Sequence, residues 1–123
     1  MNTAIWIAQA LLALVFLGAG VSKLTMPYEK QAERMGYVKD FSPGAIRTIG
    51  VLEVLGALGV VLPALTGIMP WLTPTAGIGL GLVMVGAIAT HLRRKEYPLI
   101  LVNLVLLALA ALVAYGRFVA VPL

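Results

Sequence analysis

The chain has 123 residues, of which 61% are hydrophobic and only 11% are charged. Soluble domains carry about 25% charged residues, so this composition excludes an ordinary soluble domain and indicates an integral membrane protein. The net charge of +4 does not indicate nucleic-acid binding, because most basic residues lie in or beside two connections between apolar runs. The absence of cysteine excludes thiol–disulfide chemistry and cysteine-bound metals within this chain.

Four apolar runs are long enough to cross a membrane, since a transmembrane helix needs roughly 20 apolar residues. We predict helices over about residues 3–24, 43–65, 74–92 and 98–116. With short connections these helices use up nearly all of residues 1–123. We therefore expect one all-α transmembrane domain, an up-down bundle of four helices.

The first predicted helix ends in a lysine, Lys23. Its long stem allows two placements: the ammonium extends outward to the lipid headgroups, or it points inward toward an acidic partner. Gln9, nearer the start of the same helix, is expected to make an ordinary interhelical hydrogen bond. The run is full length and no basic residue precedes it, so we interpret it as an uncleaved helix and not as a signal peptide.

A polar segment with a short amphipathic helix connects the first two spans. We predict that this helix is capped by Thr25 at its start and by Gly36 at its end. Tyr28, Ala32 and Met35 fall on one face at helical spacing. The segment is expected to lie on the membrane surface or over one end of the bundle.

The second predicted helix begins with Ser42 as its N-cap and contains the acid Glu53. Glu53 lies on the order of 15 Å into the helix, which is too deep for a short side chain to reach the membrane surface. An acid at this depth needs a partner, so Glu53 is expected to face the bundle interior. The small residues Gly50 and Gly56 beside it favour close helix packing.

The third and fourth helices carry fewer polar groups. Gly77 and Gly81 form a GxxxG pattern, which indicates close helix packing and nothing more specific. His91 closes the third helix, and Asn103 is the single polar residue inside the fourth. One histidine with one acid supplies too few ligands for a metal, so we assign no metal site.

The basic residues predict the orientation in the membrane. Seven of them lie in two regions. The connection between the first two spans and the start of the second span hold Lys30, Arg34, Lys39 and Arg47, and the connection between the last two spans holds Arg93, Arg94 and Lys95. By the positive-inside rule both connections are expected in the cytoplasm and both termini outside, in a bacterial cytoplasmic (inner) membrane.

Four polar residues from four helices are then expected to converge in or near the cytoplasmic half of the bundle. This polar cluster consists of Lys23, Glu53, His91 and Asn103. Acid and base groups in such a cluster can protonate a quinone oxygen or relay a proton. They can equally form a buried ion-pair network that only fixes the helix register. No catalytic residue is assigned.

Three blocks of the sequence resemble the DoxX family, in its DoxX-like branch of small four-helix membrane proteins. The blocks are residues 16–24, with Lys23 near the end, 49–57, with Glu53 in the middle, and 86–96, with His91. The resemblance covers nearly the whole chain. It implies a relationship to the membrane subunit of a thiosulfate–quinone oxidoreductase and to membrane redox or oxidative-stress complexes, although many members have no established activity.

Three functions therefore remain open at the level of sequence. The first is an accessory subunit of a redox system, with a possible quinone ligand and a redox protein partner, and without an autonomous enzyme activity. The second is a non-catalytic membrane scaffold or assembly factor. The third is a small-solute or proton pathway, which would require a homo-oligomer because a single four-helix bundle leaves little room for a pore. All three place the chain in a lipid bilayer and none involves nucleic acid.

Overall fold

The computed structural model describes residues 1–123 as an all-α protein without strands. Its helices are α1 (Asn2–Thr25), α2 (Tyr28–Arg34), α3 (Pro43–Gly59), α4 (Leu62–Thr66), α5 (Leu72–Arg93) and α6 (Tyr97–Tyr115), with a 3₁₀ turn η1 (Gly36–Asp40) and a π turn η2 (Gly116–Ala120). Four helical stretches are long and apolar enough to cross a membrane: α1, α3 with α4, α5, and α6 with η2. The predicted fold class is confirmed.

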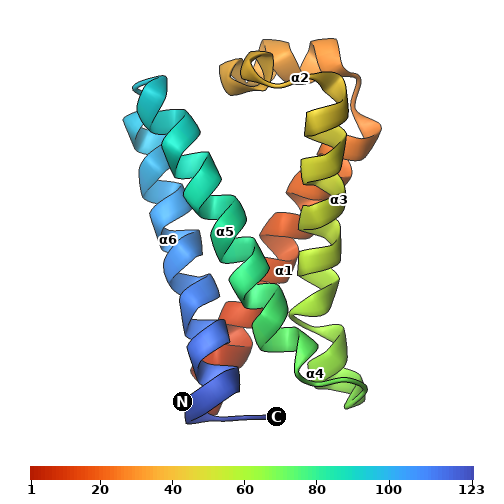
Figure 1. Cartoon of the computed structure of the whole chain (residues 1–123), viewed down its shortest axis with the longest axis vertical. Coiled ribbons are helices and arrows are strands. Elements are labelled where there is room, and N and C mark those ends of the chain that lie inside the picture. Colours follow the sequence, from red (N-terminus) through yellow and green to blue (C-terminus); the bar gives the residue numbers. More distant parts are fainter.

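The four spans form two antiparallel pairs (Figure 1). α1 packs along α3, and α5 packs along α6. The pairs contact each other through α3 with α5 and α1 with α6, and they diverge toward the end of the molecule that carries the basic connections. The chain termini lie at the end where the pairs meet. A buried apolar core joins all four spans, and its largest side chains are Phe16, Ile5, Leu12 and Leu80.

The predicted helix over 43–65 forms one span, Pro43–Thr66, but it is interrupted near its end, which corrects the expectation of a continuous helix. α3 ends at Gly59 and the short helix α4 begins at Leu62, with Pro63 in its first turn. Proline lacks the backbone N–H and its ring clashes with the carbonyl four residues earlier, so a continuous helix cannot pass this point. The break releases the carbonyl of Val60, and Gln9 Nε2 of α1 donates to it at 2.6 Å.

The connection between α1 and α3 forms a lid, defined here as α2 and η1 together, which lies across the diverging end (Figure 1). The predicted caps are wrong: Thr25 is the last residue of α1 and its hydroxyl donates to Val21 O, while Gly36 opens η1. The predicted face of Tyr28, Ala32 and Met35 is only partly buried. Met35 is exposed, and Gln31 is the buried residue of α2, with Nε2 donating to Met26 O at 2.8 Å.

The start of α3 follows the prediction. Ser42 is the N-cap, and its hydroxyl accepts a hydrogen bond from Ala45 N at 3.1 Å, with Pro43 in the first turn. A serine cap satisfies one of the N–H groups that the first turn of a helix leaves free. The cap fixes where α3 begins, and therefore the depth at which its acid lies.

Two glycines let α1 and α3 approach closely. A Cβ at Gly20 would lie 2.7 Å from Gly50 O, and a Cβ at Gly50 would lie 2.9 Å from the Cβ of Lys23. No larger residue fits on either side without moving a backbone. This crossing sets the spacing of the two helices one turn away from Glu53.

The other glycines singled out in the sequence divide into two groups. A Cβ at Gly56 would collide with the Leu80 side chain of α5, and one at Gly77 would meet Ala110 O of α6 at 3.2 Å. Gly81 is looser, with its nearest neighbour at 3.6 Å. Gly56 and Gly77 therefore pack closely within the chain, and neither is free to receive a partner helix.

The Gly20–Gly50 crossing makes a sharp prediction. Replacing Gly20 with alanine is expected to destabilise the protein by about 1–3 kcal/mol, because the added methyl collides with a backbone carbonyl that cannot rotate away. Gly18→Ala, on the same helix, is the matched control, since a Cβ there meets nothing within 4 Å. Thermal unfolding in detergent measures both. Equal effects of the two substitutions would contradict a close crossing at Gly20.

Candidate functional site

The structure pairs Lys23 with Glu53. Lys23 Nζ of α1 lies 2.8 Å from Glu53 Oε1 of α3, and the two side chains are 13% and 5% exposed. No other side chain or backbone group donates a hydrogen bond to the carboxylate. The pair is therefore an isolated acid and base buried between two apolar spans.

Lys23 points into the membrane-spanning part of the protein, not outward to its surface. In an α-helix the Cα–Cβ bond tilts toward the N-terminus, so a lysine in the last turn of α1 is already directed back along the span. The close Gly20–Gly50 crossing then brings its stem alongside α3. Arg47 takes the outer position instead, with Nη1 donating to Leu24 O at 2.8 Å.

The other two members of the predicted polar cluster do not join this pair. His91 hydrogen-bonds Glu96 through Nδ1 at 2.9 Å, and Asn103 is buried with its Nδ2 unpartnered. Neither makes a hydrogen bond or an ion pair with Lys23 or Glu53. The physical reason is the arrangement of the pairs: α5 and α6 diverge from α1 and α3 at this end (Figure 1).

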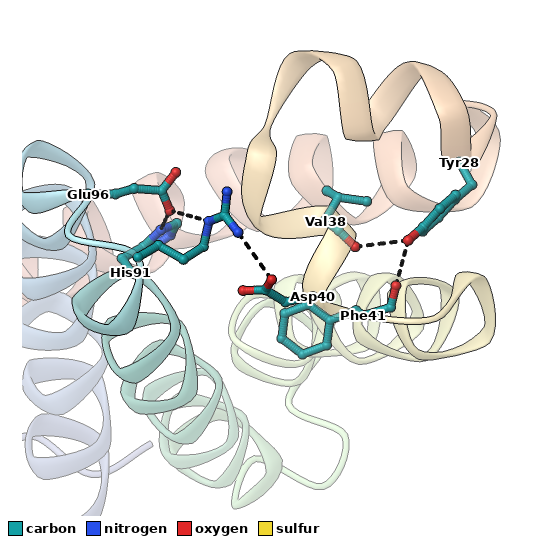
Figure 2. Close-up of polar contacts among 7 residues, drawn as sticks. Tyr28, Val38, Asp40, Phe41, His91 and Glu96 are labelled. Carbon is teal, nitrogen blue, oxygen red and sulfur yellow. Dashed lines mark hydrogen bonds and ion pairs between the residues drawn. The ribbon is translucent and has the colours of Figure 1, made fainter.

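His91 belongs to a second polar group, which connects the lid to the turn between α5 and α6. Arg94 Nη1 lies 3.1 Å from Asp40 Oδ1 of η1, and Arg94 Nε lies 3.3 Å from Glu96 Oε1. The ring of Tyr37, also in η1, meets the His91 ring edge to face at 5.2 Å. We call these five residues the latch. Figure 2 shows Asp40 on the lid side and His91 with Glu96 on the other.

Tyr28 holds the two parts of the lid, α2 and η1, together. Tyr28 OH lies 2.6 Å from Phe41 O and 3.1 Å from Val38 O, which ties the start of α2 to the end of η1 (Figure 2). The latch then bridges from this folded segment to the second helix pair. Of the latch residues, the sequence indicated only His91 as a site candidate and used Arg94 only to predict orientation. Nothing in the local pattern shows that Tyr37 and Asp40 lie opposite His91.

Glu96 is the acid at the centre of the latch, and its pKa lies below the ordinary value of 4.5. The hydrogen bond with His91 is the main cause, and the positive charge of Arg94 adds to it. A lowered carboxyl pKa contributes stability above pH 4.5, and this contribution is lost as the pH falls through the lowered pKa.

The latch therefore predicts a pH effect of defined sign. Above pH 4.5, wild-type protein is expected to melt at a higher temperature than Glu96→Gln. This difference in melting temperature should vanish as the pH falls below 4.5 and Glu96 takes up a proton. Melting curves in detergent between pH 3 and 7 measure this. Glu29→Gln, at an exposed acid without a hydrogen-bond partner, is the control. A difference that grows toward low pH would contradict the assigned role of Glu96.

A third polar group lies at the opposite end, beside the termini. Arg117 of η2 donates through Nε to Gln9 Oε1 at 2.9 Å and through Nη1 to Asn2 Oδ1 at 2.8 Å. Gln9 in turn donates to Val60 O, so one amide connects α1, α3 and η2. The sequence indicated Gln9 as an interhelical hydrogen-bonder, and the structure confirms it. Arg117 was not among the site candidates that the sequence indicated.

An apolar groove runs between α3 and α5 on the outside of the bundle. Its volume is about 630 Å³ and its lining includes Leu52, Gly56, Gly59, Ala76, Leu80 and Val83. Gly56 lies one turn beyond Glu53 on the same helix, so the groove passes close to the turn that carries the acid. Histidine and acidic side chains nowhere gather in a group of three or more that could hold a metal ion.

The comparison with known families decides the classification. A model described as the DoxX-like family matches residues 7–113, nearly the whole chain. The chain belongs to the DoxX-like family. Neither a curated protein nor a solved structure matches it. This DoxX-like protein is thus a multi-pass membrane protein of four spans, with three separate polar groups: the Lys23–Glu53 pair, the latch and the Arg117 group.

Proposed function

We propose that this DoxX-like protein is an accessory subunit of a redox system in the bacterial cytoplasmic membrane, and that it holds a quinone beside the Lys23–Glu53 pair. The observation that carries the proposal is the pair itself, an acid and a base 2.8 Å apart between two apolar spans. Ionisable groups at such depth are costly and usually mark a functional site.

The chemistry of the pair suits a quinone head group. A lysine ammonium donates hydrogen bonds and matches a carbonyl oxygen, while a carboxylate accepts one and matches the hydroxyl of the reduced form. The two groups also supply a proton donor and a proton acceptor within one site. His91 and Asn103 lie outside this pair, so the proposed head-group site consists of Lys23 and Glu53 alone.

The α3–α5 groove supports the same ligand class, because the isoprenoid tail of a quinone is long and apolar. The groove of about 630 Å³ is lined mainly by apolar side chains, among them Leu52, which is the neighbour of Glu53 in α3. In the proposed arrangement the head group lies at the pair and the tail lies along the groove toward the lipid. The basic connections face the cytoplasm, so the lid covers the cytoplasmic end of this site.

A titration with a short-chain quinone tests the proposal. Wild-type protein in detergent is expected to gain thermal stability on addition of decyl-ubiquinone, and Glu53→Gln is expected to lose this gain because its amide cannot form the ion pair. Glu29→Gln, on the exposed surface of the lid, is the control and should behave like wild type. A gain that persists unchanged in folded Glu53→Gln would refute quinone binding at the pair.

A membrane scaffold is the second candidate, and one observation favours it. A Cβ at Gly79 or Gly86 of α5 meets no atom within 4 Å, so this face is open to a partner helix. In that case Gly86→Leu, which lies outside the groove proposed for the quinone tail, would release a copurifying membrane protein and leave the response to decyl-ubiquinone unchanged. The reverse pattern would favour the quinone-linked role.

A further inference from the structure

Arg117 is a buried cation without a counter-charge. It is only 4% exposed, and its hydrogen-bond partners are the neutral oxygens of Gln9, Asn2 and Val121. Its Nη2 is buried and has no partner at all. The acidic side chains of the chain lie in the lid, in α3 and in the α5–α6 turn, and none of them forms an ion pair with Arg117.

A buried charge that lacks an opposite charge is unfavourable, because burial removes the water that would otherwise solvate it. The neutral hydrogen bonds satisfy Nε and Nη1 but leave the net charge of the guanidinium uncompensated. Arginine cannot lose its proton to relieve this cost. An anion that lies against the guanidinium would supply the missing opposite charge.

The surroundings add a second positive feature. Arg117 lies along the first two turns of α1, since it bonds Asn2 and Gln9, and the first turn of α1 contains no acidic residue. The N-terminal end of a helix carries a partial positive charge and attracts anions. The Asn2 side chain accepts from Arg117 instead of capping the helix.

The position of the group indicates which anion it meets. The Trp6 ring lies 5.4 Å from the Arg117 guanidinium carbon, and tryptophan is typical of the boundary between apolar chains and headgroups. Arg117 itself lies in the last turns of the fourth span. At that depth the abundant anion is the phosphate of a phospholipid.

We propose that Arg117, with the first turn of α1, binds a phosphate group, supplied in the membrane by a phospholipid headgroup. A guanidinium presents two parallel N–H groups that match two oxygens of one phosphate. Nη2 is buried and has no partner, and Nη1 makes its second hydrogen bond to Val121 O, directly after η2. The phosphate takes the place of this carbonyl and reaches Nη2 from there. This site is at the opposite end from the Lys23–Glu53 pair and does not depend on the quinone proposal.

Four probes, each added to delipidated protein in detergent, distinguish binding through phosphate from binding through acyl chains. They are phosphatidylglycerol, phosphatidylcholine, inorganic phosphate, and diacylglycerol, which has acyl chains but no phosphate. Both phospholipids are expected to raise the melting temperature, and diacylglycerol is not. Arg117→Met is expected to weaken phosphatidylglycerol binding by about ten-fold or more, since a charge-assisted hydrogen bond is lost.

Arg93→Met is the control, since this arginine is exposed at the other end of the molecule and makes no hydrogen bond or ion pair. Competition by inorganic phosphate at the same site would support the phosphate site and identify free phosphate as a second source. Equal stabilisation by diacylglycerol, an equal loss in Arg93→Met, or no response to any phosphate-bearing probe would overturn the proposal. Should Arg117→Met fail to fold, the wild-type comparison of phosphatidylglycerol with diacylglycerol decides alone.

Discussion

Replacing Lys23 with methionine is expected to destabilise the protein by about 3–5 kcal/mol. Methionine retains the length and apolar packing of the lysine stem and removes only the charge. Glu53 is then left as a buried acid without a partner, and it must either stay charged in an apolar environment or take up a proton. Chemical or thermal unfolding in detergent measures the loss.

The double substitution Lys23→Met with Glu53→Leu tests the reason for this loss. It replaces the ion pair with two apolar side chains and is expected to recover most of the stability, because isolated buried pairs contribute little once desolvation is counted. Lys30→Met, at an exposed lysine without a partner on α2, is the control and should change stability by less than about 0.5 kcal/mol. A double variant no more stable than Lys23→Met would contradict this account of the pair.

Gln9→Leu is expected to have the next largest effect. The substitution removes both the donor to Val60 O and the acceptor from Arg117 Nε, which lie 2.6 Å and 2.9 Å from the Gln9 amide. Each buried group left without a partner costs about 1–3 kcal/mol, so the two together make a loss of several kcal/mol. Without the Gln9 amide, α1 also loses its hydrogen bond to Val60 O at the end of α3.

Thr75→Val is the matched control for Gln9→Leu, since the Thr75 hydroxyl bonds only Trp71 O within its own helix. Its melting temperature should stay close to wild type. The double variant Gln9→Leu with Arg117→Met should lose less than the sum of the two single losses, because the substitutions share one contact. Strict additivity would show that the contact between Gln9 and Arg117 carries no energy.

The sequence predicts the four-helix fold and the inward direction of Glu53 because both follow from the depth and composition of the spans. A lone acid ten residues into an apolar helix requires a partner, and Lys23 is one of the few cations within reach. The sequence alone does not decide whether the Lys23 side chain points outward to the headgroups or inward to Glu53. That choice depends on the Gly20–Gly50 crossing, which is a relation between two helices and not a property of either one.

The remaining site features arise from contacts across the fold. His91 lies at the depth expected for the polar cluster, but the divergence of the two helix pairs leaves it to Glu96 and to Tyr37 of the lid. Arg117 lies near the end of the fourth span, and its partners Gln9 and Asn2 come from the other end of the chain. The position of Pro63 could have been used to predict the break in the second span. Proline at this point ends α3 and leaves the Val60 carbonyl free to accept a hydrogen bond from Gln9.

Native mass spectrometry of the protein, extracted from its membrane in a mild detergent, tests whether a quinone binds at the Lys23–Glu53 pair. We expect one quinone bound per chain, identified after extraction, and its loss in Glu53→Gln while the helical content of the variant is retained. Wild-type protein that carries phospholipid but no quinone would contradict the proposed function, as would a quinone retained equally by Glu53→Gln.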